Sequence, residues 1–184
     1  MDKGAESYRR FLDGDDSGLV EMIGEYRQGL ILFLNGIVHD LHEAEDITED
    51  TFVRLLVKKP VFSGASSFKT WLYSVARNSA YDHLRHREKE QDFASYGAEE
   101  GYSEDDAEAA YIKEERRLLL HSAMKELPPD YRQVLYLIYF EDFDNAGAAK
   151  IMKKSKRQIE NLIFRAKKAL RSKLETEGFV YEDK

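Results

Sequence analysis

Apolar side chains recur at helical spacing along most of this 184-residue chain, as they do in amphipathic helices that pack on a common core. With only three prolines to interrupt these stretches, the pattern predicts an all-α fold. A short helix at 8–12 ends in the turn Asp13–Asp16, and Asp16 or Ser17 caps the longer helix that follows. The apolar stripe of that helix comprises Leu19, Val20, Ile23, Tyr26, Leu30, Phe33, Leu34 and Ile37.

Two more helices complete a first four-helix unit. One runs from Glu43 to about Lys58 and ends before Pro60. The other begins after the small-residue loop 61–67, where Ser66 or Ser67 is its predicted cap. The residues predicted to be buried in these two helices are Ala44, Ile47, Thr51, Phe52, Leu55, Leu56, Phe68, Trp71, Leu72 and Val75.

The composition changes over residues 90–112, which carry eight acidic residues and no basic one. Because like charges repel, this segment is predicted to be an extended, flexible linker between two small helical domains. Mimicry of nucleic acid, which would shield basic surfaces of the free protein, is the alternative. A second helical unit begins at Lys113 and contains a central helix after Pro128-Pro129 that is apolar on nearly all sides. The tail 177–184 has no periodic pattern.

The most unusual charge pattern lies in Lys150–Leu174, which has ten basic residues and one acidic residue, Glu160. Its local charge of +9 stands in a chain of net charge −7. Ser155 and Gln158 have the spacing of a capping box, which predicts a helix from Lys156 onward. A short helix, a brief turn and a basic helix form the pattern of a helix-turn-helix. A solvated surface helix is the alternative.

Several classes of function lack support in the sequence. The chain contains no nucleotide-binding or catalytic signature, so an enzyme, a cofactor and a small-molecule substrate are not expected. It contains no cysteine, and its five histidines are scattered, so no metal site is predicted either. No apolar run is long enough for membrane insertion, and the N-terminus lacks a signal-peptide core, so we expect a soluble cytoplasmic protein.

DNA recognition would divide the basic helix between base contacts and phosphate contacts. Ser155, Arg157, Gln158, Asn161 and Arg165 are the candidates for the major groove. The candidates for phosphate contacts are Lys153, Lys154, Lys156, Lys167 and Lys168. Glu160 has two open interpretations, a contact with a cytosine amino group or an ion pair with a neighbouring lysine.

Four segments together resemble a known family. Residues 43–56 (EAEDITEDTFVRLL), 68–87 (FKTWLYSVARNSAYDHLRHR), 126–143 (ELPPDYRQVLYLIYFEDF) and 155–170 (SKRQIENLIFRAKKAL) are similar to bacterial RNA polymerase sigma factors of the small, two-domain ECF type. The resemblance implies a domain at 1–89 that binds core polymerase and opens the −10 promoter element. It implies a second domain at 113–176 that binds the −35 element. The implied partners are promoter DNA, the β′ clamp and β flap of the polymerase, and an anti-sigma factor.

The same resemblance implies roles for individual residues. The expected contacts with core polymerase are Asp46, Glu49, Asp50 and Arg54, with Glu49 standing where the family usually has an amide. The expected contacts with the −10 element are Phe62, Ser63, Gly64, Ala65, Ser66, Ser67, Lys69, Tyr73, Arg77, Asn78, Arg85 and Arg87. The expected contacts with the −35 element are Ser155, Lys156, Arg157, Gln158, Asn161, Phe164, Arg165 and Lys168.

Two further features bear on these roles. Trp71 could stack on a base, but its place in an apolar stripe favours packing in the core. Gly147-Ala148 stands where the family usually has a glutamate-isoleucine pair, which predicts weaker packing of the first helix of the helix-turn-helix. A stand-alone helix-turn-helix regulator remains the competing hypothesis, although no dimerisation helix or sensor domain is visible.

Overall fold

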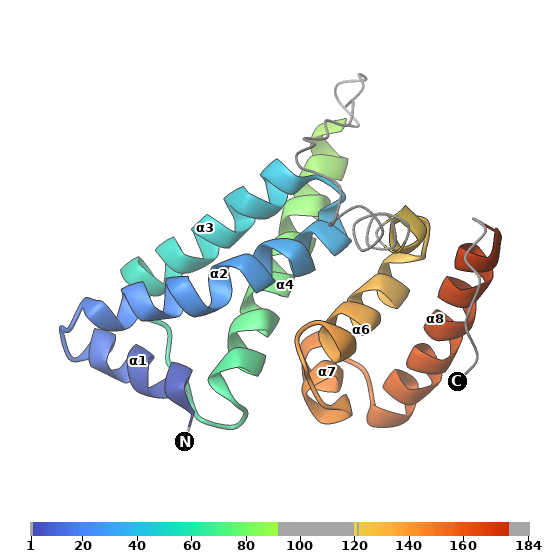
Figure 1. Ribbon diagram of the computed structural model, residues 1–184. Coiled ribbons are helices and arrows are strands. Elements are labelled where there is room, and N and C mark those ends of the chain that lie inside the picture. Colours follow the sequence, from blue (N-terminus) through green and yellow to red (C-terminus); the bar gives the residue numbers. More distant parts are fainter. Residues whose placement is uncertain (1, 92–119, 121, 177–184) are drawn as a thin grey trace, which may run out of the picture.

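The computed structural model describes residues 2–91, 120 and 122–176, and the regular elements in these residues are all helices, as predicted. The helices are α1 (Lys3–Leu12), α2 (Ser17–Val38), α3 (Leu41–Lys58), α4 (Phe68–Gln91), α6 (Pro129–Tyr139), α7 (Asn145–Met152) and α8 (Lys156–Thr176). Helix α4 extends to Gln91, two residues into the predicted acidic linker 90–112, and the rest of that linker lies outside the described residues, as does the tail. Figure 1 shows α1–α4 gathered on one side and α6–α8 on the other, with α8 outermost.

Side-chain caps set the starts of the helices in the first unit. Asp2 accepts a hydrogen bond from the Ala5 amide at 3.1 Å, so α1 begins five residues earlier than predicted. Asp40 caps α3 through the Glu43 amide at 3.0 Å. Ser67, one of the two predicted caps of α4, accepts from the Thr70 amide at 3.2 Å. Each bond satisfies one of the amides that a helix start leaves without a partner.

The predicted cap of α2 is confirmed in its position but not in its hydrogen bond. Asp16 occupies the cap position, but its side chain makes no capping bond. Instead, the Asp15 carboxylate accepts from the backbone amide and the hydroxyl of Ser17, at 3.0 and 2.6 Å. Helical backbone angles at Asp16 (φ −61°, ψ −19°) explain the difference, since a cap residue usually needs an extended conformation.

The second unit also follows most of the predicted local pattern. Ser155 and Gln158 exchange hydrogen bonds between side chain and backbone, at 2.7 and 3.2 Å, which confirms the capping box and the start of α8. Asp144 caps α7 through the Gly147 amide at 2.7 Å. Three residues join α7 to α8, and the first of them, Lys153, has left-handed backbone angles (φ 55°). This is the short connection expected between the two helices.

The central helix α6 differs from its prediction in one respect. It was expected to be apolar nearly all round, but Tyr139 and the following Phe140 are about half exposed, at 52% and 50%. Near the start of the helix, by contrast, two polar residues are buried: Arg132 is 5% exposed and Gln133 is 1% exposed. The reason lies in tertiary packing, because the face of α6 that carries Arg132 and Gln133 meets the first unit rather than solvent.

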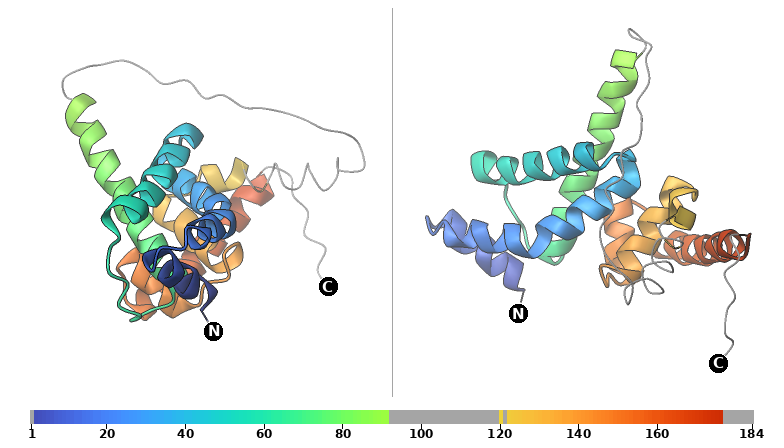
Figure 2. Two further views of the ribbon diagram at one scale, coloured as in Figure 1. Left: turned by 90° about the vertical axis from the view of Figure 1, so that its left-hand side faces the viewer. Right: turned by 45° about the horizontal axis from the view of Figure 1, so that its top comes forward.

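The two units pack directly against each other. Helix α7 lies along α4, and α6 lies along α2 (Figure 1), so their buried apolar side chains form one continuous cluster. Phe33 of α2 illustrates this continuity, because its ring lies 5.4 Å from the ring of Tyr73 and 6.3 Å from that of Tyr136. The last turns of α4 project beyond the other helices (Figure 2).

Two glycines of α2 have opposite surroundings. A Cβ atom added at Gly24 would have no atom within 4 Å, apart from its own local backbone. A Cβ atom added at Gly29 would lie 2.4 Å from the Tyr73 hydroxyl and 2.6 Å from a carboxylate oxygen of Glu141. Of these two glycines, Gly29 is therefore the one that a close approach between the units requires.

We predict that Gly24→Ala raises the free energy of unfolding by about 0.5–1 kcal/mol, because alanine favours the helix and nothing obstructs its methyl group. Gly29→Ala, the matched variant on the same helix, should lower that free energy by about 1–3 kcal/mol, because the packed Tyr73 ring must move. Urea denaturation of the two variants and the unsubstituted chain measures both changes. Equal effects of the two substitutions would contradict the packing described around Gly29.

Candidate nucleic-acid interface

Helix α8 presents a continuous basic surface to solvent. Its apolar face is turned inward, where Ile159, Ala166 and Leu174 are buried, and the helix packs against α6 and α7. All of the residues expected to contact the −35 element are exposed: Ser155, Lys156, Arg157, Gln158, Asn161, Phe164, Arg165 and Lys168. Phe164 is 71% exposed, which is unusual for a large apolar side chain. The arrangement leaves amide, guanidinium and aromatic groups available to a ligand.

The lysines around the α7–α8 turn are not equivalent. Lys154 forms an ion pair with Asp130 in the first turn of α6 at 3.0 Å, and its side chain is only 28% exposed. It therefore helps to join α8 to α6, in addition to its expected contact with phosphate. Lys153 and Lys156 are exposed, as are Lys167 and Lys168 on the following turns, and Glu160 is exposed among them.

Helix α3 carries a second exposed surface of different chemistry. The four residues expected to bind polymerase, Asp46, Glu49, Asp50 and Arg54, are all exposed. The Glu49 carboxylate also forms an ion pair with the Arg27 guanidinium of α2, at 3.4 Å between Oε1 and a terminal nitrogen.

Three apolar residues of the same helix are exposed beside these acids: Val53 (52%), Leu56 (46%) and Val57 (66%). The prediction that Leu56 is buried was wrong, and helical periodicity did not decide it, because Leu56 lies four residues after the buried Phe52. The surface is thus both acidic and apolar.

The loop before α4 is held by its aromatic residue. The Phe62 ring packs against Phe68 and Trp71, with ring centroids 5.6 and 5.4 Å apart, and is partly buried. Trp71 is also partly buried and lies 5.6 Å from the Tyr8 ring, so it packs against the core as expected. Ser63, Gly64, Ala65 and Ser67 remain exposed. Gly64 has a positive φ of 73°, which suits glycine at this bend.

Three of the expected −10 residues on α4 face the second unit instead of solvent. Lys69 Nζ lies 2.9 Å from a carboxylate oxygen of Glu141, and the Tyr73 hydroxyl donates to the same oxygen at 2.7 Å. Arg77 Nε donates to Gln133 Oε1 at 2.9 Å. Exposure is 0% for Tyr73 and 8% for Arg77, so the expected open track for a single strand is covered here.

The cause of this correction is a contact that no local pattern reveals. Glu141 and Gln133 lie about sixty residues or more from their partners along the chain, in and just after α6. Burial, together with the hydrogen bond to Glu141 and the charge of that carboxylate, raises the pKa of Tyr73 far above its usual value. The phenol therefore stays protonated and continues to donate.

The C-terminal part of α4 is engaged within the first unit. Arg87 donates to both carboxylate oxygens of Glu43, at 2.9 and 2.8 Å, and so joins α4 to the start of α3. Arg85 is exposed and pairs with Asp82 on its own helix. Asn78, expected near the base pocket, is partly buried. The structure therefore does not gather all the expected −10 residues on one open surface.

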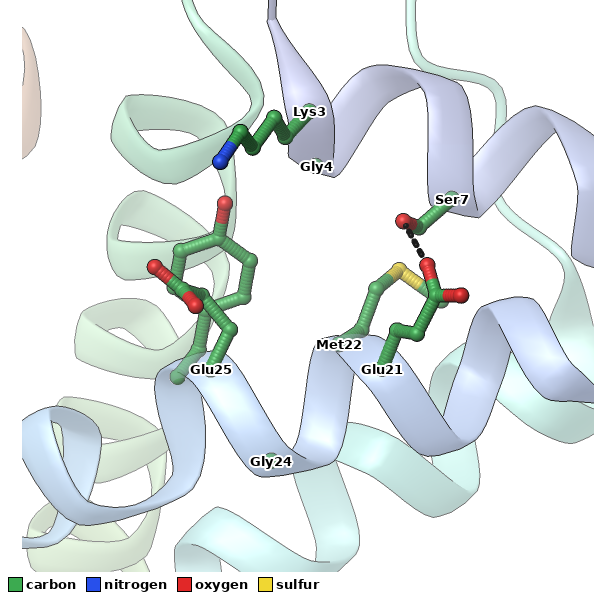
Figure 3. A pocket seen from close by; sticks show the side chains of 8 residues that line it. Lys3, Gly4, Ser7, Glu21, Met22, Gly24 and Glu25 are labelled. Atoms are coloured by element: carbon green, nitrogen blue, oxygen red, sulfur yellow. Dashed lines mark hydrogen bonds between the residues drawn. The ribbon is translucent and has the colours of Figure 1, made fainter.

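A hollow of about 280 Å³ lies between α1 and α2 (Figure 3). Its rim carries Lys3 and Glu25, and the Ser7 hydroxyl donates to Glu21 at 2.7 Å across it. Within the described parts of the chain, no three histidine or acidic side chains are grouped as metal ligands would be. No described helix is long and apolar enough to cross a membrane.

Comparison with known proteins finds two matching family models. Residues 22–90 match the model of sigma-70 region 2, and residues 117–170 match that of sigma-70 region 4. The chain is 30% identical to the ECF RNA polymerase sigma factor SigM of Bacillus subtilis, over 83% of this chain and 92% of SigM. It is 28% identical to the RNA polymerase sigma-H factor of Pseudomonas aeruginosa, over 85% and 86% of the two chains.

Two solved structures have a similar fold. One is CnrH in complex with the cytosolic domain of CnrY, with a TM-score of 0.63 and 18% identity over 95% of this chain and 96% of that one. The other is the sigma factor RpoE in complex with the anti-sigma factor NepR from Bartonella quintana, with a TM-score of 0.61 and 24% identity over 84% and 95%. The chain belongs to the ECF-type RNA polymerase sigma factors, non-enzymatic proteins that direct RNA polymerase to promoters.

Proposed function

We propose that residues 1–89 dock on core RNA polymerase and open the −10 element, while residues 113–176 bind the −35 element. The acidic segment 90–112 would serve as the flexible spacer between them, and the protein would act in the cytoplasm. The observation that carries the proposal is the presence of two exposed surfaces of opposite charge, acidic on α3 and basic on α8. One chain can then bind a protein partner and DNA at the same time.

The proposed −35 contact uses α8 as a recognition helix. Helices of this kind enter the major groove with their N-terminal half, and arginine and amide side chains there read base edges. The N-terminal half of α8 exposes three such side chains, those of Gln158, Asn161 and Arg165. Lys156 and Lys168 would hold the phosphates on either side, and the capping box would keep the start of the helix ordered.

The proposed −10 contact uses the loop 62–67, Asn78 and the basic residues of α4. Extrusion of a base from the duplex costs a few kcal/mol, and a polar pocket offsets that cost by binding the edges of the base. The serines and backbone of the loop supply such polar groups, while the packing of Phe62 on Trp71 holds the loop in place. Lys69, Tyr73 and Arg77 would bind the single strand by charge and stacking once they are accessible.

The proposed polymerase contact uses the surface of α3. Asp46 and Asp50 would meet a basic partner such as the β′ clamp, and the adjacent Val53 and Val57 would add apolar area to the interface. On the second unit, the exposed Tyr139 and Phe140 offer an aromatic surface for the β flap.

An anti-sigma factor is proposed as a further partner. Its support is the likeness of fold to a sigma factor solved together with its anti-sigma factor. The proposal as a whole is tested by sequencing the transcripts that purified core polymerase makes with and without this protein. Transcripts that start at defined promoters only when the protein is added are the expected result. Identical transcript sets would reject the proposal.

The acidic docking surface leads to a charge-reversal prediction. Asp46→Lys combined with Asp50→Lys should lower the affinity for core polymerase at least tenfold, because like charges then meet across the interface. Circular dichroism should show an unchanged fold, since both side chains are exposed. Asp13→Lys combined with Glu25→Lys makes the same charge change just after α1 and on α2 and should leave the affinity near its original value. An equal loss in both double variants would argue against α3 as the docking surface.

The basic helix leads to a prediction about base reading. Arg165→Ala should cost about 1–3 kcal/mol at one promoter position and little elsewhere if the guanidinium reads a base edge. Lys168→Ala should weaken binding to all sequences alike and reduce the salt dependence of affinity, as expected for a phosphate contact. Binding of the holoenzyme to a panel of single-position promoter variants at several salt concentrations separates the two outcomes. A uniform loss with Arg165→Ala would reassign that residue to the phosphates.

A further inference from the structure

The loop proposed to receive the extruded base, residues 62–67, is tied at both ends to helix α1. Before the loop, the Tyr8 hydroxyl donates to the backbone carbonyl of Pro60 at 2.6 Å. After the loop, the backbone amide of Phe68 donates to the Asp2 carboxylate at 2.6 Å. These bonds join residues 52 and 66 positions apart in the chain, so no local sequence pattern reveals them.

The Asp2 carboxylate serves the starts of two helices at once. Its Oδ1 accepts from the Ala5 amide at 3.1 Å and caps α1, while its Oδ2 accepts from the Phe68 amide, the first of α4. The amides at a helix start have no partner within the helix and favour a negative charge. A carboxylate has two acceptor oxygens and so can bind one amide from each helix, which an uncharged amide side chain cannot do.

Ring packing supports the loop from the same side. The Tyr8 ring lies 5.4 Å from Phe68 and 5.6 Å from Trp71, and these are the two rings on which Phe62 rests. Tyr8 is 1% exposed, and its burial raises the pKa of the phenol above its usual value. The hydroxyl therefore stays protonated and continues to donate to Pro60.

The first turn of α1 lies directly against α4 and α2. A Cβ atom added at Gly4 would be 2.6 Å from a ring atom of Phe68 and 2.4 Å from the Tyr26 hydroxyl. Glycine at this position therefore allows the approach that brings Asp2 to the start of α4 (Figure 1). Helix α1 precedes residue 22, where the match to sigma-70 region 2 begins, so the family comparison assigns it no role.

We propose that α1 is a positioning element for recognition of the −10 element, in which Asp2 and Tyr8 set the geometry of the loop 62–67. The inference rests on the proposed function of that loop as the base pocket. Asp2 and Tyr8 act through the backbone at the two ends of the loop and do not themselves touch DNA. A pocket that is already in its binding geometry needs no further ordering when the base arrives, and such ordering would weaken binding.

Asp2→Asn tests the proposal with little change in shape. Asparagine caps a helix about as well as aspartate, but its one acceptor oxygen leaves either the Ala5 or the Phe68 amide without a partner. The link between the two helix starts is then broken. The matched control is Asp40→Asn, which removes the same charge from the same unit. Asp40 caps α3 through the Glu43 amide at 3.0 Å, and one oxygen is enough for that bond.

Core polymerase combined with each full-length variant transcribes a library of promoters with randomised −35 and −10 positions, and the transcripts are sequenced. The measured quantity is the ratio of transcripts from the most and least favoured bases at each position. If the loop then holds its binding geometry about a tenth of the time, Asp2→Asn lowers the ratio at the −10 position that the loop reads by up to about tenfold. The −35 ratios should stay the same, and Asp40→Asn should change neither element.

Three outcomes of the promoter experiment count against the inference. An unchanged −10 ratio with Asp2→Asn would overturn it. An equal loss at both elements, or the same −10 loss with Asp40→Asn, would reduce Asp2 to a contributor to general stability and would overturn it as well. Flat −10 ratios with the unsubstituted chain would reject the proposed function of the loop itself, so that failure is recognised separately.

The single tryptophan of the chain reports on the loop without DNA or polymerase. Trp71 packs against Phe62 of the loop and Tyr8 of α1, so loosening of the loop should expose its indole. Emission at a longer wavelength and stronger quenching by acrylamide are expected with Asp2→Asn and not with Asp40→Asn. A lower −10 ratio without any change in Trp71 fluorescence would contradict an effect that acts through the loop.

Tyr8→Phe tests the second anchor independently, because it keeps the ring and removes only the bond to Pro60. It should lower the −10 ratio and leave the −35 ratios unchanged, and its combination with Asp2→Asn should lower the −10 ratio further than either change alone. Tyr26→Phe is the control, since the Tyr26 ring lies 5.9 Å from that of Phe68 but lines the hollow between α1 and α2. Equal −10 ratios in the two tyrosine variants would argue against Tyr8 as an anchor of the loop.

Discussion

One polar contact lies within the apolar packing between the two units: the Glu141 carboxylate binds the Lys69 ammonium at 2.9 Å and the Tyr73 hydroxyl at 2.7 Å. This contact joins the start of α4 to the turn between α6 and α7, and the aromatic rings of Phe33, Tyr136 and Phe143 lie around it. A carboxylate is stable in such surroundings only because an ammonium and a phenol compensate for its lost hydration. Gly29 leaves the space that this arrangement requires.

The contact also explains why the exposed surfaces differ in availability. The acids of α3 and the basic face of α8 point away from the interface between the units and remain open to large partners. Tyr73 and Arg77 of α4, which are proposed to bind the −10 strand, lie within the interface and are covered.

The residue pair Gly147-Ala148 leads to different expectations from the sequence and from the structure. In the family pattern, loss of a larger pair predicts weaker packing of α7. In the structure, Ala148 is fully buried, and a Cβ atom at Gly147 would lie 3.0 Å from the Phe143 ring and 3.2 Å from a carboxylate oxygen of Asp144, so a larger residue there would crowd the turn before α7. Whether α7 is less stable remains a prediction.

The sequence by itself determined the helices, their caps at Ser67 and Ser155, the turn into α8 and the exposed basic face of that helix. Each of these depends on residues within one or two turns of one another, so periodicity and spacing are sufficient to find them. The same local information identified the family and its two regions.

Only the tertiary structure decided which of the expected site residues are accessible. The burial of Tyr73 and Arg77 depends on Glu141 and Gln133, which are distant in sequence and come close only when the units pack. Helical periodicity assigns a residue to a face, but it does not say whether that face meets solvent or another helix. Tyr139, expected within an apolar central helix, is half exposed for the same physical reason.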